Sequence, residues 1–197
     1  MAGWRSRPIL GGGRMDAPGW GGAGETRVRV SRVRWSVLAI ISLMYMVTYI
    51  DRSNISVAAP AIARELSLSK IELGLVFSAF IWAYAIGQVP GGWLADRFGP
   101  RRVLLVLVVF WSVMTSVTAF ATGIVSLFVI RFVFGLGEAG AFPTASRAMQ
   151  LWFPRSERGL VQGVTHCLSR FAVVITPAVS VQVMLWFGWR WIFHLSA

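Results

Sequence analysis

The stretch "GGWLADRFGPRR" (Gly91–Arg102) separates two long apolar runs of this 197-residue chain. It begins with two glycines at the end of one apolar run, and Asp96 stands close to basic residues. Short connections rich in arginine are typical of the cytoplasmic side of membrane proteins. Glycine pairs allow helices to pack closely or the chain to turn tightly. The stretch therefore predicts a cytoplasmic connection between two spanning helices.

The composition of the whole chain supports a membrane protein. It is 56% hydrophobic and 14% charged, whereas a soluble domain is about 45–50% apolar and about 25% charged. The net charge of +11 falls in the N-terminal segment and between apolar runs, a pattern that favours membrane topology over nucleic-acid binding. A single cysteine excludes an intrachain disulfide, and the sequence holds no phosphate-binding loop or metal-ligand spacing. We expect no cofactor and no metal.

Five apolar runs are long enough to cross a bilayer, which takes about 20 helical residues. They predict helices over approximately 35–59, 72–95, 103–121, 124–149 and 160–187, and a sixth begins at "WRWIFHLSA". Pro60 is expected to end the first helix. The fold class is thus an all-α, polytopic membrane bundle over 32–197. Residues 1–31, rich in Gly and Arg, are expected to form a disordered cytoplasmic tail.

Basic residues in the connections predict the orientation. Alternate connections carry nine basic residues on the side of the N-terminus and three on the opposite side. Because lysine and arginine are enriched in cytoplasmic loops, we expect a cytoplasmic N-terminus in a multi-pass protein of the cell inner membrane.

The order of residue types in Gly91–Arg102 is specific. The pattern small-x-x-x-Asp-Arg-x-Gly-x-Arg-Arg, placed between the second and third spans, resembles the signature loop of the major facilitator superfamily. In that family the loop helps to latch one conformation by contacting the other half of the transporter. The resemblance assigns this role to Gly92, Asp96, Arg97, Gly99, Arg101 and Arg102.

Asp51 and Arg52 lie side by side within the first apolar run, in "YIDRSNIS". A charge at mid-membrane costs about 2.5–3.5 kcal/mol on insertion scales, so neither side chain is expected to face lipid. Tyr45, Tyr49 and Arg52 fall at i, i+4 and i+7 and share one helix face. Asp51 points about 100° away from Arg52. The two charges are therefore predicted to face different partners.

The fourth run offers those partners. Arg131 and Glu138 are seven residues apart and project from the same face of a helix. Glycines around them, in "FGLGEAG", allow another helix or a substrate to approach. We expect the two helices to form a buried cluster of four charges. It could bind substrate, clamp the bundle as a structural ion-pair network, or do both.

A narrower resemblance follows from these two segments. Asp-Arg in the first span, together with "RFVFGLGEAGAFP" in the fourth, is similar to the anion:cation symporter family. That family includes bacterial sugar-acid importers and, more distantly, vesicular glutamate transporters and sialin. The resemblance implies that the chain binds a small organic anion, a sugar acid or related carboxylate, together with protons. The implied proton carriers are Asp51 and Glu138; the implied anion-binding residues are Arg52, Arg131, Tyr49 and Tyr84.

Elementary chemistry agrees with that assignment. A guanidinium binds a carboxylate through two parallel hydrogen bonds and keeps its charge. A substrate anion on the arginine weakens the arginine's hold on a neighbouring carboxylate, which then takes up a proton more readily. Anion and proton binding are thereby coupled positively, as symport requires.

The fifth run carries two further polar side chains, His166 and Arg170, one helical turn apart. Sugar-acid importers commonly have an uncharged polar residue near this place. Arg170 could be a third substrate contact, implying a more acidic substrate, or could pair with Asp51 or Glu138. His166 is expected to be a packed, hydrogen-bonded residue. The segment "ITPAVS" lacks the glycine-rich proline motif of the family's antiporters, which favours symport over efflux.

The resemblance extends from about residue 32 to the end. Transporters of this superfamily hold their substrate between two six-helix halves, and the chain corresponds to the first half, with five complete spans and the start of a sixth. We expect it to lack its C-terminal six-helix partner and to transport nothing alone. The alternative is a membrane interaction or regulatory fragment that moves no substrate. An enzyme using Asp51 and Glu138 as acid and base has no substrate motif behind it.

Overall fold

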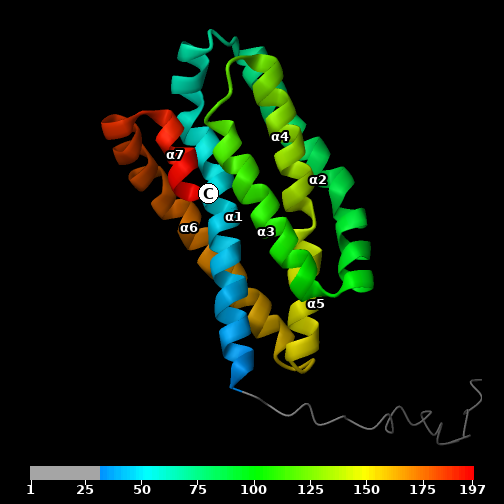
Figure 1. The fold of residues 1–197 in the computed structure, drawn as a ribbon. Helices are drawn as coiled ribbons and strands as arrows, with labels where there is room; N and C mark the ends of the chain where they lie inside the picture. Colours follow the sequence, from blue (N-terminus) through cyan, green and yellow to red (C-terminus); the bar gives the residue numbers. More distant parts are fainter. Residues whose placement is uncertain (1–31) are drawn as a thin grey trace, which may run out of the picture.

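The computed structural model describes residues 32–197, and this part of the chain is helical (Figure 1). The predicted tail over 1–31 lies outside the described residues. The helices are α1 (Val33–Glu65), α2 (Lys70–Phe98), α3 (Pro100–Thr118), α4 (Ile124–Ala139), α5 (Ala141–Trp152), α6 (Arg158–Phe187) and α7 (Trp189–Ser196).

The number of spans agrees with the sequence pattern. Five helical segments of the described chain are long and apolar enough to cross a membrane: α1, α2, α3, α4 with α5 taken together, and α6. The short helix α7 begins at Trp189, where the sequence predicts a sixth span. The prediction of an all-α polytopic bundle is confirmed.

The expectation that Pro60 ends the first helix is wrong. Helix α1 continues through this proline to Glu65. Proline removes only its own N–H donor from the helix, and packing on either side stabilises the remaining turns. Ala58 and Ile62 are fully buried, whereas Pro60 itself is exposed.

The fourth predicted helix is interrupted. A turn at Gly140 divides it into α4 and α5. Pro143 has no N–H to donate to the carbonyl of Ala139, four residues earlier, so the regular ladder of hydrogen bonds fails there. The hydroxyl and amide of Thr144 instead donate to the Gly140 carbonyl, at 2.6 and 3.2 Å.

Two single-residue connections depend on glycine. Gly99, between α2 and α3, has φ of +81°, and Gly188, between α6 and α7, has φ of +86°. Side chains rarely adopt this conformation, so glycine makes both sharp turns possible. At the start of α2, Ser69 and Glu72 each accept a hydrogen bond from the other's backbone N–H.

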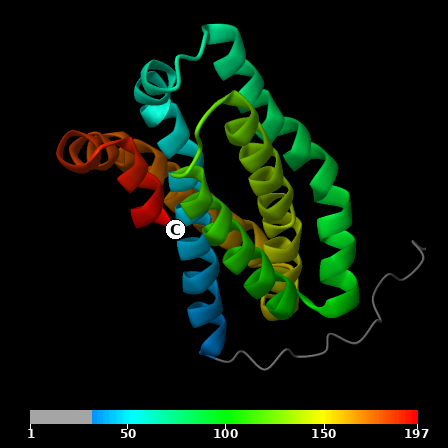
Figure 2. The ribbon, with the colours of Figure 1, turned by 45° about the horizontal axis from the view of Figure 1, so that its top comes forward.

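The helices associate in two groups. Helix α1 packs along α6, while α2 packs along α4, and α3 lies against α4 and α5. Figures 1 and 2 show the two pairs on different sides of the bundle. Helix α7 contacts α1, α3 and α6 and so joins the groups at one end.

Small residues bring α2 into contact with α4 and with the junction between α4 and α5. A Cβ atom added to Gly91 would lie 2.3 Å from the Cα of Gly140, and one added to Gly87 would lie 2.7 Å from the Cβ of Ala139. On α4, a Cβ on Gly135 would lie 2.7 Å from the Phe80 carbonyl oxygen. The predicted close approach of a helix to these glycines is confirmed.

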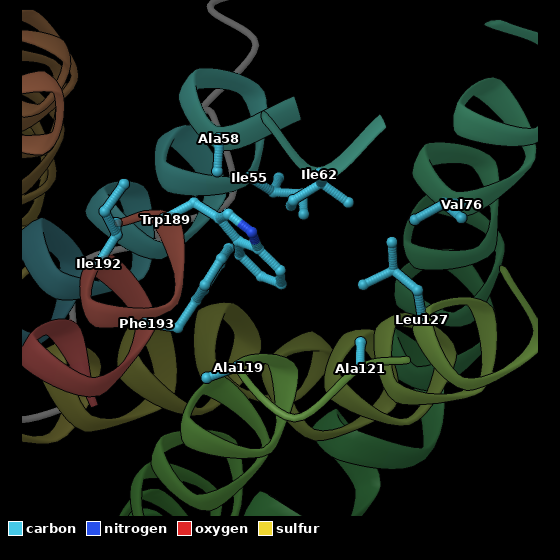
Figure 3. Close-up of a cluster of buried hydrophobic side chains, with 10 residues drawn as sticks. All are labelled: Ile55, Ala58, Ile62, Val76, Ala119, Ala121, Leu127, Trp189, Ile192 and Phe193. Carbon is cyan, nitrogen blue, oxygen red and sulfur yellow. The ribbon is translucent and has the colours of Figure 1, made fainter. Parts of the chain in front are cut away.

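At the opposite end of the bundle, α7 completes an apolar cluster (Figure 3). Trp189 and Phe193 project from α7 toward Ile55 and Ile62 of α1. The indole nitrogen of Trp189 also donates to Glu65, at 2.6 Å, and Arg190 pairs with the same carboxylate. These contacts fix the position of α7 next to the charged residues of α1 and α4.

Candidate functional site

A cavity of about 90 Å³, open on one side, lies where α1 faces α2, α4 and α5. Its polar lining comes from Tyr45, Thr48, Tyr49 and Arg52 of α1, Tyr84 of α2 and Glu138 of α4. Tyr45, Tyr49 and Arg52 were expected to share a face from their spacing, and they do. Six polar side chains from three helices therefore converge on one space within the apolar spans.

Arg52 and Glu138 form an ion pair across this cavity. The Nε of Arg52 donates to Oε1 of Glu138 at 3.0 Å, and the glutamate side chain is only 1% exposed. The guanidinium carbon of Arg52 lies 4.4 Å from the ring centroid of Tyr84 and 5.4 Å from that of Tyr49. Aromatic faces thus hold the cation in place of water. The second oxygen of Glu138 is buried and accepts no hydrogen bond from the described residues.

A second cavity, of about 210 Å³, also borders Arg52. Arg131 of α4 lines it together with Arg52, and the remaining lining is largely apolar. Arg131 is 4% exposed, and its Nε and Nη2 are buried without a hydrogen-bond acceptor among the described residues. Its guanidinium carbon lies 5.2 Å from the ring of Phe134 and 5.7 Å from that of Phe193. A buried cation with spare donors is chemically suited to bind an anion.

Asp51 faces away from Arg52, as its position on the helix predicts. One of its oxygens accepts a long hydrogen bond of 3.5 Å from the hydroxyl of Thr115 on α3, and the other is buried without a partner in the described chain. Asp51 and Glu138 are the acidic neighbours of Arg131. The predicted cluster of four charges is therefore present, with one direct ion pair, between Arg52 and Glu138.

The two polar residues of α6 lie beside the first cavity. Arg170 is exposed, and its guanidinium carbon lies 5.3 Å from the ring centroid of Tyr49. It forms no ion pair with Asp51 or Glu138, the second alternative left open by the sequence. His166 packs its ring against Tyr45 and against Phe142.

Most of the predicted latch loop is helical. Gly91, Gly92, Asp96 and Arg97 belong to the last turns of α2, and Gly99 alone connects α2 to α3. The arginines at 101 and 102 lie exposed in the first turn of α3.

Sequence reasoning missed the ion pair that this segment makes. The Nε of Arg147 on α5 lies 3.3 Å from Oδ1 of Asp96, and both side chains are well exposed. The one sign of this ion pair in the sequence is Arg147, a single charged residue near the end of the fourth apolar run.

A second missed contact joins α1 to α6. The hydroxyl of Ser180 donates to the side-chain oxygen of Asn54 at 2.7 Å, and both residues are buried. Polar side chains inside apolar spans bond across helix interfaces, and Asn54 lies one turn beyond Asp51. The pair fixes α6 against the charged segment of α1.

Comparison with known proteins gives a family. The sequence profile of the Major Facilitator Superfamily matches residues 41–197. "Probable sulfoacetate transporter SauU" of Cupriavidus necator is 51% identical over 159 residues, which cover 81% of this chain and 37% of that protein. "Probable galactarate/D-glucarate transporter GudP" of Bacillus subtilis is 38% identical over 167 residues, which cover 82% of this chain and 37% of that protein.

A solved structure has the same fold. It is the crystal structure of a bacterial homolog to the human lysosomal transporter Spinster, in an inward-facing and unoccupied conformation. The TM-score is 0.75 at 24% identity, and the match covers 84% of this chain and 40% of that one. The chain thus spans well under half the length of the proteins it resembles, and those proteins are named as transporters, not enzymes.

Proposed function

This chain belongs to the Major Facilitator Superfamily, and from that premise we propose that it carries the anion and proton sites of an organic-anion:proton symporter. The transporter lies in the cell inner membrane with its N-terminus in the cytoplasm. A C-terminal six-helix half supplies the other wall of the site, and the chain alone moves no substrate. The proposed substrate is a small carboxylate, either a sugar acid or a sulfonated carboxylate. The names of the relatives, for galactarate, D-glucarate and sulfoacetate, support that class.

One observation carries the proposal: Arg131 is a buried guanidinium whose Nε and Nη2 have no acceptor, and it shares a cavity with Arg52. Leaving such donors unpaired in the interior is expensive. An arginine that served only to clamp the bundle would form a direct ion pair, and no carboxylate of the described residues lies at ion-pair distance from Arg131. We therefore assign the anion to Arg131 and Arg52, with the hydroxyls of Tyr49 and Tyr84 at the edge of the site.

The ion pair between Arg52 and Glu138 suggests how protons couple to the anion. Glu138 and a substrate carboxylate compete for the same guanidinium, which binds either through charge-assisted hydrogen bonds. A proton on Glu138 removes one competitor and frees Arg52. Asp51 is an acidic neighbour of Arg131 without a direct ion pair, and a proton on Asp51 would remove a negative charge that opposes an anion on Arg131. Proton binding then favours anion binding and the reverse holds equally, which is the linkage a symporter needs.

The proposed conformational latch combines two parts. The Asp96–Arg147 pair connects the cytoplasmic ends of α2 and α5, and the exposed Arg101 and Arg102 follow it. We assign these arginines to contacts with the other half of the transporter. Arg97 stacks on Trp93, at 5.2 Å, and borders the same region.

The anion site is tested directly by binding. The 197-residue chain in lipid nanodiscs is titrated with sulfoacetate by isothermal calorimetry. Arg131→Gln should lower the affinity at least tenfold, because a charge-assisted pair is lost. Arg64→Gln is the matched control: it removes the same charge from the exposed end of α1 and should change the affinity less than twofold. Equal binding by wild type and Arg131→Gln would refute the assignment.

Proton coupling needs the complete protein. Where the reading frame continues beyond Ala197 into six further spans, uptake of labelled substrate into vesicles should rise with an inward proton gradient. Glu138→Gln should remove this dependence and leave exchange of substrate across the membrane. Uptake indifferent to the gradient would refute symport.

A further inference from the structure

We propose that Arg170 binds a second anionic group of the substrate, so that the site selects a dianion over a monoanion of similar size. This inference rests on the proposed function and specifies its substrate class. The geometry around Tyr49 carries it.

Arg170 and Arg52 lie against one aromatic ring. The guanidinium carbon of Arg170 is 5.3 Å from the ring centroid of Tyr49, and that of Arg52 is 5.4 Å from the same centroid. Tyr49 lines the first cavity, and the two arginines come from different helices, α6 and α1. Two cations are thereby brought to one wall of the site.

Among the described residues, the site holds one more cation than it holds carboxylates. Glu138 forms an ion pair with Arg52, and Asp51 is an acidic neighbour of Arg131. Within the described residues, Arg170 has no carboxylate at ion-pair distance and no hydrogen-bond acceptor. Its guanidinium makes a cation–π contact with the ring of Tyr49. One positive charge of the site is therefore left over.

The position of Arg170 along α6 makes this surplus significant. It lies 12 residues from the start of the helix at Arg158, or about 18 Å along the axis. Because α6 has 30 residues and is about 45 Å long, it exceeds a bilayer core about 30 Å thick, and Arg170 lies in the part of the helix that crosses this core. An unpaired cation at this depth is expensive and marks a substrate pathway by default. A compact substrate with one anionic group on Arg52 places its second group toward Arg170, on the other arginine that contacts Tyr49.

The test compares anions that differ in one charge. The chain in nanodiscs is titrated with sulfoacetate, a dianion, and with isethionate, in which a hydroxymethyl group replaces the carboxylate. Wild type should prefer sulfoacetate by about tenfold or more, because the second group makes a charge-assisted hydrogen bond. Arg170→Gln should lower this preference about tenfold, and Arg170→Lys should retain most of it, since the cation is kept. Arg64→Gln again serves as the control and should keep the wild-type preference.

Each outcome has one meaning. Equal affinity of wild type for the two anions, or an unchanged preference in Arg170→Gln, would overturn dianion selection and leave the organic-anion site standing. Failure of both anions to bind wild type would count against the proposed function itself. The wild-type preference is measurable even if Arg170→Gln does not fold.

Discussion

Replacing Gly91 by alanine should separate α2 from the junction between α4 and α5. The new Cβ atom would lie 2.3 Å from the Cα of Gly140, inside the distance that real Cβ contacts reach. The obstructing atom belongs to the backbone, so no rotamer change can relieve the overlap. One of the two helices has to move.

The size of the effect follows from two opposing terms. Alanine in place of glycine within a helix stabilises it by about 1 kcal/mol. Overpacking a well-filled interface costs about 1–3 kcal/mol, and a contact between backbones belongs to the upper part of that range. We therefore expect Gly91→Ala to lower the free energy of unfolding by about 1–2 kcal/mol.

Gly92 provides the matched control, one residue further along α2. A Cβ atom there would meet only the Cβ of Pro143, at 3.6 Å, which is an ordinary contact. Gly92→Ala should therefore gain the helical preference of about 1 kcal/mol. Reversible unfolding of the chain in mixed micelles, followed by circular dichroism, measures both variants. If Gly91→Ala were as stable as Gly92→Ala, the inferred contact between the helices would be refuted.

Three further changes test the site and its support. Glu138→Gln removes a competitor for Arg52, so anion affinity at constant pH should rise several-fold in calorimetry; weaker binding would contradict the competition. Ser180→Ala leaves the side-chain oxygen of Asn54 unpaired and should cost about 1–3 kcal/mol in the same unfolding assay, whereas an exposed pair would cost almost nothing. Trp189→Ala empties the centre of the apolar cluster in Figure 3 and should cost about 3–5 kcal/mol; a smaller loss would mean that α7 does not hold that end together.

The spans were predictable because hydropathy is averaged over about 20 residues and tolerates local irregularity. The interruptions of the helices were not predictable, because one proline of this chain lies in a continuous helix and another lies next to a break. Pro60 lies within an unbroken helix, while Pro143 accompanies a break at Gly140. The difference depends on what packs around each turn, and a sequence read by itself does not contain that information.

The charged residues of the site could be predicted from the free energy that a charge costs within a membrane, but the ion pairs between them could not. Helical periodicity places Arg131 and Glu138 on one face of α4, opposite Asp51 and Arg52 of α1, but does not say which charges meet. The structure joins Glu138 to Arg52, and Arg131 keeps two donors free. Periodicity gives the face of a helix, whereas the partner depends on how neighbouring helices are rotated. The Asp96–Arg147 pair escaped notice for the same reason.

The glycine contacts between α2 and α4 also determine which helices can move. The close contacts at Gly87, Gly91 and Gly135 leave no room for a side chain between α2 and the segment formed by α4 and its junction with α5. We expect these tightly packed helices to move together in a rearrangement. The cavities lie on the other boundary, where α1 faces α2 and α4. Displacement of α1 at that boundary would carry Arg52 away from Glu138, and opening of the site and breakage of the ion pair would then be a single mechanical event.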